Sequence, residues 1–179
     1  MKKIAIYPGT FDPITYGHID LIKKGISIFD KLIVAVSEGG EKNHLFSTDE
    51  RIKLVKSSLL KDMKISSKKI QIIKFSSLTT NLCKKYKSNI ILRGLRAVSD
   101  FEYEFQLAGM NRKLNDKIET VFLMSDVDNQ VISSRLVKEI ANLNGNLKKL
   151  FQYFGSAFYS FQQVEIHIQN QIQLLSHAI

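Results

Sequence analysis

The sequence has few of the residues that mark disulfide-bonded or membrane-spanning proteins. Cys83 is its one cysteine, tryptophan is absent, and prolines number only two. Since no disulfide can form within the chain, we expect a reducing compartment. No apolar run approaches the roughly 20 residues of a membrane-spanning helix. The start, Met-Lys-Lys and four residues before Pro8, is too short for the core of a secretory signal. We therefore expect a cytoplasmic protein with no membrane partner.

Acidic residues are also in the minority. The chain has 26 Lys and Arg against 17 Asp and Glu, a formal net charge of +9. Such a balance can attract nucleic acid or phosphorylated metabolites. The lysines are scattered, however, without interleaved aromatics or a DNA-reading motif. We interpret most of the charge as a solvated surface and expect no nucleic-acid partner. A nucleic-acid-binding module remains an alternative, which salt-sensitive DNA binding without ATP-dependent chemistry would support.

Short apolar runs rich in β-branched residues are plentiful, and segments with helical spacing lie between them. This alternation predicts an α/β fold, a Rossmann-like doubly wound parallel sheet covered on both faces. In such sheets ligands bind beyond the carboxyl ends of the strands. The predicted strands are Ile4–Tyr7, Leu32–Val36, Ile70–Phe75, Ile90–Leu92 and Thr120–Leu123.

Four helices are predicted from apolar spacing and capping residues. Apolar residues recur every three or four positions from Ile19 to Phe29, which predicts the first helix. Ser47 or Thr48 could cap a second helix. Two more helices are predicted over Asp100–Leu114 and Ser133–Leu143, and Gly145 is the expected C-cap of the second.

The chain changes character near residue 150. Residues 150–179 carry Glu165 as their one charged side chain among Asp, Glu, Lys and Arg. Phe151, Phe154, Phe158 and Phe161 follow helical spacing. We therefore predict a catalytic domain over residues 1–149. Residues 150–179 would form a divergent, helical C-terminal extension of it, packed on this domain or on a neighbouring subunit.

The first predicted strand runs directly into a stiff turn, Gly9–His18. Both prolines, Pro8 and Pro13, lie at this turn and fix φ. Gly9 allows a ligand to approach the backbone, and His18 falls in the first turn of the helix that follows. Free backbone N–H groups and the helix dipole attract phosphate there. The imidazole can donate to a phosphate oxygen, most strongly when protonated. The segment therefore predicts a nucleotide site, although it is neither a Walker loop nor a GxGxxG motif.

Two motifs carry a family resemblance. Gly9-Thr10-Phe11-Asp12-Pro13, followed by Thr15-Tyr16-Gly17-His18, resembles the T/HxGH signature of the nucleotidyltransferase superfamily. The stretch from Arg93-Gly94-Leu95-Arg96 through Asp100-Phe101-Glu102-Tyr103-Glu104 to Asn111-Arg112 is narrower. It closely resembles the bacterial phosphopantetheine adenylyltransferase family, and the likeness runs from about residue 3 to residue 150.

The resemblance implies that ATP and 4′-phosphopantetheine react to give dephospho-coenzyme A and pyrophosphate. The acceptor phosphate would attack the α-phosphorus in line, without a covalent enzyme intermediate. Such chemistry needs positioning and positive charge around the transition state. The family match assigns catalysis to Thr10, His18, Lys42 and Arg93. ATP binding falls to Gly9, Thr10, Phe11, His18, Gly94, Arg96, Glu104, Ser133 and Ser134, and acceptor binding to Thr10, Lys42, Leu78, Thr79, Arg93 and Asn111.

Two positions depart from the family pattern. Gly39-Gly40-Glu41, before Lys42, replaces the commoner Asn-Pro-x. Arg135 follows Ser133 and Ser134 where the family usually has a third small hydroxyl residue. It could supply a cation to the triphosphate or point outward. Asp100 and Glu102 we interpret as favourable acids at a helix start.

The resemblance further implies a homo-hexamer of two stacked trimers, and Mg²⁺ bound with ATP through phosphate oxygens and water. No residue cluster predicts a metal site of the protein itself. A sister nucleotidyltransferase acting on nicotinate mononucleotide or glycerol phosphate is the first alternative. A catalytically altered nucleotide-binding protein is the second.

Overall fold

The computed structural model describes residues 2–39, 44–126, 133–143 and 145–146. Within them lies a five-stranded parallel sheet in the order β3-β2-β1-β4-β5. Its strands are β1 (Ile4–Gly9), β2 (Lys31–Ser37), β3 (Ile70–Phe75), β4 (Ile90–Leu95) and β5 (Glu119–Met124). Each contains a predicted apolar run, so the predicted doubly wound fold is confirmed. The calls on Lys42 and on residues 150–179 fall outside the described residues.

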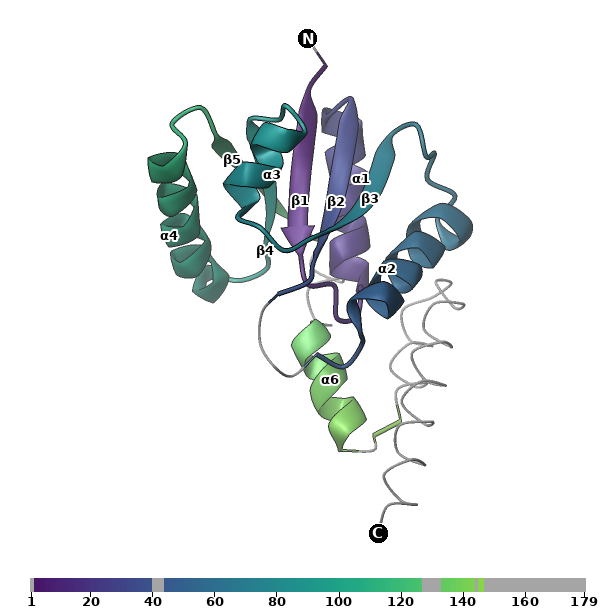
Figure 1. Cartoon of the computed structure of the whole chain (residues 1–179). Helices are drawn as coiled ribbons and strands as arrows, with labels where there is room; N and C mark the ends of the chain where they lie inside the picture. The colour runs from purple at the N-terminus through teal and green to yellow at the C-terminus, as the bar shows by residue number, and fades with distance from the viewer. Residues whose placement is uncertain (1, 40–43, 127–132, 144, 147–179) are drawn as a thin grey trace.

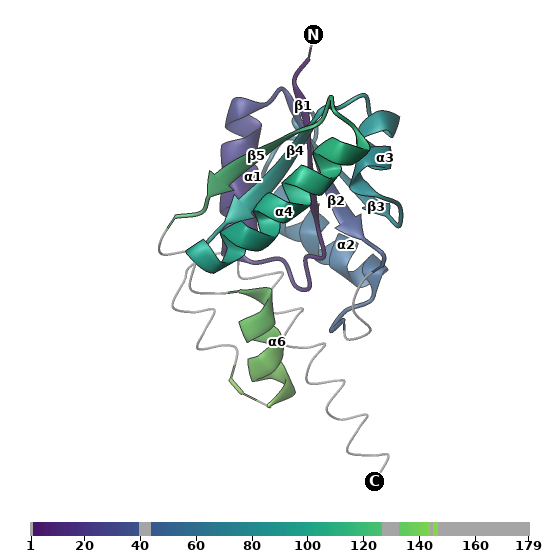
Figure 2. The ribbon, with the colours of Figure 1, turned by 90° about the vertical axis from the view of Figure 1, so that its left-hand side faces the viewer.

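Helices cover both faces of the sheet (Figures 1 and 2). They are α1 (Tyr16–Ile28), α2 (Thr48–Lys56), α3 (Thr79–Lys85), α4 (Val98–Leu114) and α6 (Ser134–Asn142), with a π-helix η1 (Ser57–Asp62) after α2. Ser47 caps α2 as predicted, since its Oγ accepts a hydrogen bond from the backbone N–H of Glu50. No helix among the described residues is long and apolar enough to cross a membrane.

Strand residues alternate between two apolar clusters, one on each face. Ala5, Leu32 and Val34 pack in the larger cluster with residues of α1 and α2. Ile6 and Ile33 pack in the smaller one with residues of α3. Burial on both faces is the reason the strand sequences read as continuous apolar runs rather than as an alternation.

The sheet opens at the carboxyl ends of β1 and β4. β1 pairs with β2 along all six of its residues, but with β4 only through Ala5 and Ile6. The chain connects β1 to β2 on one side and turns to β4 on the other, so this is the topological switch point at which such sheets bind ligands.

Candidate active site

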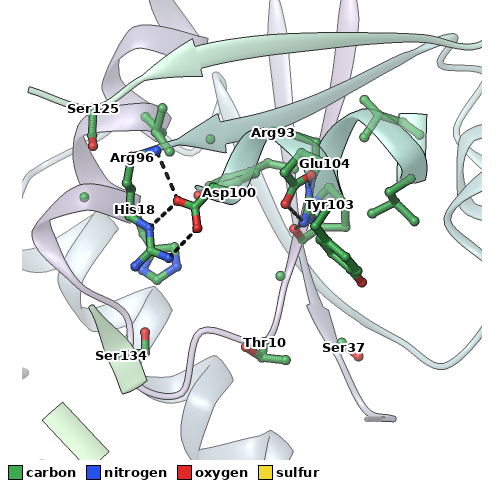
Figure 3. A pocket seen from close by; sticks show the side chains of 18 of the residues that line it. Thr10, His18, Ser37, Arg93, Arg96, Asp100, Tyr103, Glu104, Ser125 and Ser134 are labelled. Carbon is green, nitrogen blue, oxygen red and sulfur yellow. Dashed lines mark hydrogen bonds and ion pairs between the residues drawn. The ribbon is translucent and has the colours of Figure 1, made fainter. Parts of the chain in front are cut away.

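A cavity of about 470 Å³ lies at this opening. The β1–α1 turn, the ends of β2, β4 and β5, helix α4 and the start of α6 all contribute to its wall (Figure 3). The predicted site residues on the wall are Gly9, Thr10, Thr79, Arg93, Gly94, Arg96, Glu104, Asn111, Ser133, Ser134 and His18. Sequence positions more than 120 residues apart therefore meet at one edge of the sheet.

Phe11 is a predicted ATP residue whose side chain lies in the core, so an ATP contact through its backbone stays a prediction. Its side chain is fully buried in the core, packs edge-to-face on Tyr7 at 5.4 Å between ring centroids, and does not line the cavity. A Cβ on Gly9 would come within 2.9 Å of the Phe11 ring. Phe11 thus anchors the turn from the core. Gly9 suits its position because it has no Cβ and the Phe11 ring packs against its backbone.

His18 is held by the N-terminus of its own helix. Its Nδ1 accepts a hydrogen bond from the Thr15 backbone N–H at 3.1 Å and lies 2.9 Å from Thr15 Oγ1. A backbone N–H can only donate, so Nδ1 carries no proton and the neutral ring has its proton on Nε2. Burial, and secondarily the charges of Arg96 and Arg93, lower the pKa of His18 from 6.5 to about 4. The unliganded site therefore offers a neutral Nε2–H donor rather than the imidazolium that the sequence suggested as the stronger donor.

Arg93 bridges the gap where β1 and β4 stop pairing. Its Nη1 donates to the Pro8 carbonyl at 3.0 Å, and its Nε donates to Glu104 Oε2 at 2.7 Å. Nη2 donates to Glu104 Oε1, completing a two-pronged pair. Burial alone would lower the pKa of Arg93, but the Glu104 carboxylate raises it overall. Two of the five guanidinium N–H groups remain for a ligand.

This pairing gives Glu104 a function that the sequence did not reveal. Its predicted place on the ATP side stays a prediction, and both carboxylate oxygens accept from Arg93. The two side chains are largely buried, coming from β4 and α4 respectively. Glu104 therefore fixes the orientation of the guanidinium inside the cavity.

Arg96 and Asp100 form a second, more exposed pair beside the first (Figure 3). Arg96 Nε lies 3.0 Å from Asp100 Oδ2, and that oxygen also accepts from the Arg96 backbone N–H. Asp100 stands in the first turn of α4, so its predicted place at a helix start is confirmed. It also holds Arg96 at the cavity wall.

Gly94, between the two arginines, permits close packing of β4 on α1. A Cβ there would lie 2.2 Å from Leu21 Cδ1. A larger residue at Gly94 would therefore require the Leu21 side chain to move out of its packed position.

Helix α6 brings two adjacent serines to the cavity with different hydrogen bonds. Ser133 caps the helix, accepting from the Leu136 backbone N–H at 3.1 Å. Ser134 donates its hydroxyl to the Pro13 carbonyl at 2.8 Å and so ties α6 to the β1–α1 turn. Arg135 also lines the cavity and is exposed.

Two of the residues predicted to bind the acceptor near α3 and on α4 line the cavity, and one does not. Asn111 is buried on the cavity wall, and Thr79 lies at the start of α3 on the same wall. Leu78 is the residue before α3; it is exposed and does not line the cavity.

Sequence reasoning missed two buried charged residues, Asp12 and Arg51. Asp12 accepts hydrogen bonds from the backbone N–H groups of Leu45 and Phe46. Arg51 reaches the Thr10 carbonyl at 2.8 Å. A signal for Arg51 was present, because it stands three residues before a leucine on the buried face of its helix.

Proteins of known name resemble this chain over most of its length. The family model described as cytidylyltransferase-like matches residues 6–140. The phosphopantetheine adenylyltransferase of Pelagibacter ubique is 69% identical over 149 residues, which are 83% of this chain and 91% of that protein. The enzyme of the same name from Geotalea daltonii is 52% identical over 148 residues, covering 83% of this chain and 89% of the relative.

Solved structures agree on the fold. Nicotinic acid mononucleotide adenylyltransferase from Plasmodium falciparum, complexed with NaAD, aligns with a TM-score of 0.64. The alignment covers 85% of this chain and 90% of that one, with 18% identity. At that identity the likeness concerns the fold alone.

Proposed function

The chain belongs to the cytidylyltransferase-like family and, within it, to the phosphopantetheine adenylyltransferases, and we infer its function from that membership. It transfers the adenylyl group of ATP to 4′-phosphopantetheine, giving dephospho-coenzyme A and pyrophosphate. The observation that carries this conclusion is the 69% identity over 149 residues to a relative of that name. The motif residues also line one cavity at the switch point of the sheet.

We propose a direct in-line displacement, in which the acceptor phosphate attacks the α-phosphorus and pyrophosphate leaves. This reaction requires positioned donors and cations around the phosphates rather than a nucleophilic side chain. Thr10 and the Nε2–H of His18 would contact the reacting phosphate. Arg93 would bind the acceptor phosphate through the two N–H groups that Glu104 and Pro8 leave open. Lys42 keeps its proposed role in catalysis and acceptor binding on the evidence of the sequence alone.

The remaining ATP contacts divide between two elements. Arg96 and Gly94, at the end of β4, would face the nucleotide. The N-terminus of α6, with Ser133 and Ser134, would hold the β- and γ-phosphates through backbone N–H groups at the positive end of the helix dipole. Thr79 and Asn111 would border the pantetheine arm. What supports these roles is that all six residues line the same cavity.

Mg²⁺ would enter with ATP, held by phosphate oxygens and water. The described residues contain no group of three or more His, Cys, Asp and Glu that could hold a metal ion. Glu104 and Asp100, two carboxylates on the wall, are engaged by arginines. This donor set fits a metal bound through the substrate, whose positive charge would assist departure of pyrophosphate.

We further propose a cytoplasmic homo-oligomer, with six subunits as the family expectation. Helix α4 supports an assembly because apolar side chains lie exposed along it, including Phe105, Met110 and Leu114. A helix with apolar residues on several sides is typical of one covered by neighbours.

The test is an acceptor panel with the purified full chain, ATP and Mg²⁺. Pyrophosphate release and dephospho-coenzyme A formation are measured with 4′-phosphopantetheine, nicotinate mononucleotide and glycerol 3-phosphate. We expect product with the first acceptor alone. Turnover of another acceptor would assign the chain to a sister activity, and ATP binding without product would indicate an altered, non-catalytic protein.

A further inference from the structure

The largest fully buried side chain among the described residues is an arginine outside the predicted site. Arg51, in the first half of α2, is 1% exposed. A buried charge is strongly unfavourable unless hydrogen bonds replace the lost water. Burial accordingly lowers the pKa of Arg51, against the opposing charge of Asp12.

The hydrogen bonds of Arg51 reach three different segments, at three backbone carbonyls and one side-chain hydroxyl. Nη1 donates to the carbonyls of Thr10 and Ser37, both at 2.8 Å. Nε donates to the Phe46 carbonyl at 3.1 Å, and Nη2 to Thr48 Oγ1 at 2.9 Å. One rigid, planar group thereby joins the β1–α1 turn, the end of β2 and the start of α2.

Two of these three segments belong to the cavity wall. Thr10 and Ser37 both line it, whereas Arg51 does not (Figure 3). Asp12, in the same turn as Thr10, accepts from the N–H groups of Leu45 and Phe46, which precede α2, at 2.9 and 3.0 Å. The turn is thus tied to the segment before α2 through this carboxylate and to α2 itself through the Arg51 guanidinium.

Removal of the guanidinium would leave the Thr10, Ser37 and Phe46 carbonyls without this donor, so a loss of stability alone does not identify its function. The same group also defines the spacing between the Thr10 and Ser37 carbonyls, which both accept from one nitrogen. Phosphoryl chemistry is sensitive to such spacing, since a misplacement of about 1 Å can reduce rate about a hundredfold.

We propose that Arg51 is a positioning residue for adenylyl transfer. It acts through Thr10, whose place relative to the end of β2 it determines, and it does not contact substrate itself. The inference rests on the proposed function, because Thr10 is assigned to the reacting phosphate there.

The test compares Arg51→Met with Arg112→Met, a matched change at an exposed arginine at the far end of α4 that does not line the cavity. We expect Arg51→Met to lower kcat about tenfold or more, with KM for both substrates changed by less than about threefold. Folded fraction is determined by circular dichroism, and kcat is expressed per folded enzyme. Arg112→Met should match the parent chain.

Arg51→Lys provides the second variant, and it applies if the methionine variant does not fold. A lysine keeps the charge but cannot reach the Thr10, Ser37 and Phe46 carbonyls together, so kcat should stay about tenfold below the parent. A kcat per folded molecule equal to the parent in the folded variants would overturn the proposal, as would a rise in KM alone.

Failure of the proposed function would be recognised separately, because the parent chain itself would then make no dephospho-coenzyme A. In that event the readout is hydrogen exchange of the backbone amides in the turn that carries Thr10, measured by mass spectrometry. Faster exchange there in Arg51→Lys than in the parent and in Arg112→Met would support positioning of Thr10, and equal exchange would refute it.

Discussion

His18 illustrates how local contacts decide the chemistry of a single residue. Thr15, at the N-cap, donates its backbone N–H to Nδ1, which leaves Nε2–H as the free polar group of the ring. This is the capping-box arrangement, with an imidazole where a glutamate is more usual. A neutral donor avoids an additional buried positive charge near Arg93 and Arg96 before ATP arrives.

We predict that the His18 imidazole stays neutral down to about pH 5 in the unliganded protein. Its folded pKa of about 4 lies below the ordinary 6.5 because the ring is buried and two arginines are near. The measurement is an NMR titration of the imidazole protons, assigned with His18→Gln. A midpoint near 6.5 for the assigned resonance would contradict the prediction.

The lowered pKa also makes stability depend on pH. Between pH 4 and 6.5 the unfolded chain binds a proton on His18 that the folded chain does not, so the free energy of unfolding rises with pH across this window. The His18 contribution is complete above about pH 6.5 and falls by about 3 kcal/mol towards pH 4, since each pKa unit corresponds to about 1.4 kcal/mol. Urea unfolding at several pH values should show this slope in the parent and not in His18→Gln.

At the scale of elements, the N-terminus of α6 is the least conventional part of the site. Ser133 uses its hydroxyl to cap the helix, and Ser134 uses its own to hold the Pro13 carbonyl. Lys138 adds a contact between the same helix and Asp12, at 3.5 Å. The helix is therefore docked on the β1–α1 turn, and under the proposed function its backbone N–H groups would be the main phosphate donors.

Arg135→Ser tests whether the departure from the family pattern affects catalysis. Backbone groups and the helix dipole do not depend on this side chain, so we expect kcat to stay within tenfold of the parent. Pyrophosphate release measures it, with Arg112→Ser as a control at another exposed arginine. A loss greater than tenfold in Arg135→Ser alone would show that the guanidinium contributes to triphosphate binding.

At the scale of the whole molecule, α4 presents one face to the cavity and leaves others uncovered. Glu104 and Asn111 are buried on the cavity side. Phe101 stacks on Phe105 at 5.7 Å between centroids, and both are exposed. Exposed aromatic side chains gathered on one helix are typical of an interface. The helix that orients Arg93 is thus also the best candidate for subunit contact.

We predict that Phe105→Glu reduces the size of the assembly. Phe105 is 63% exposed, so a charge is tolerated in the free subunit but opposed in a desolvated interface. Light scattering coupled to size exclusion measures the mass. Ile28→Glu is the control, since Ile28 is a 51% exposed apolar residue on α1. A normal mass for Phe105→Glu, or equal dissociation of both variants, would speak against α4 as the interface.

The sequence by itself determined the sheet, most helix limits and the location of the site. Apolar runs with flanking helical periodicity are local signals, and parallel topology then brings Gly9, Arg93 and Ser133 to one edge. The helix-capping serines, Ser47 and Ser133, were predictable for the same reason, because capping involves residues only three positions away.

Only the tertiary structure decided which partner each charged side chain has. The Phe11 side chain is part of the core, although nothing in its neighbours along the chain specifies that it turns inward, and an ATP contact through the Phe11 backbone stays a prediction. Glu104 pairs with Arg93 across 11 positions, and Arg51 reaches Thr10 across 41. Such contacts depend on how helices pack on the sheet. Burial and hydrogen-bond geometry, which set the protonation of His18 and the orientation of Arg93, exist only once that packing has formed.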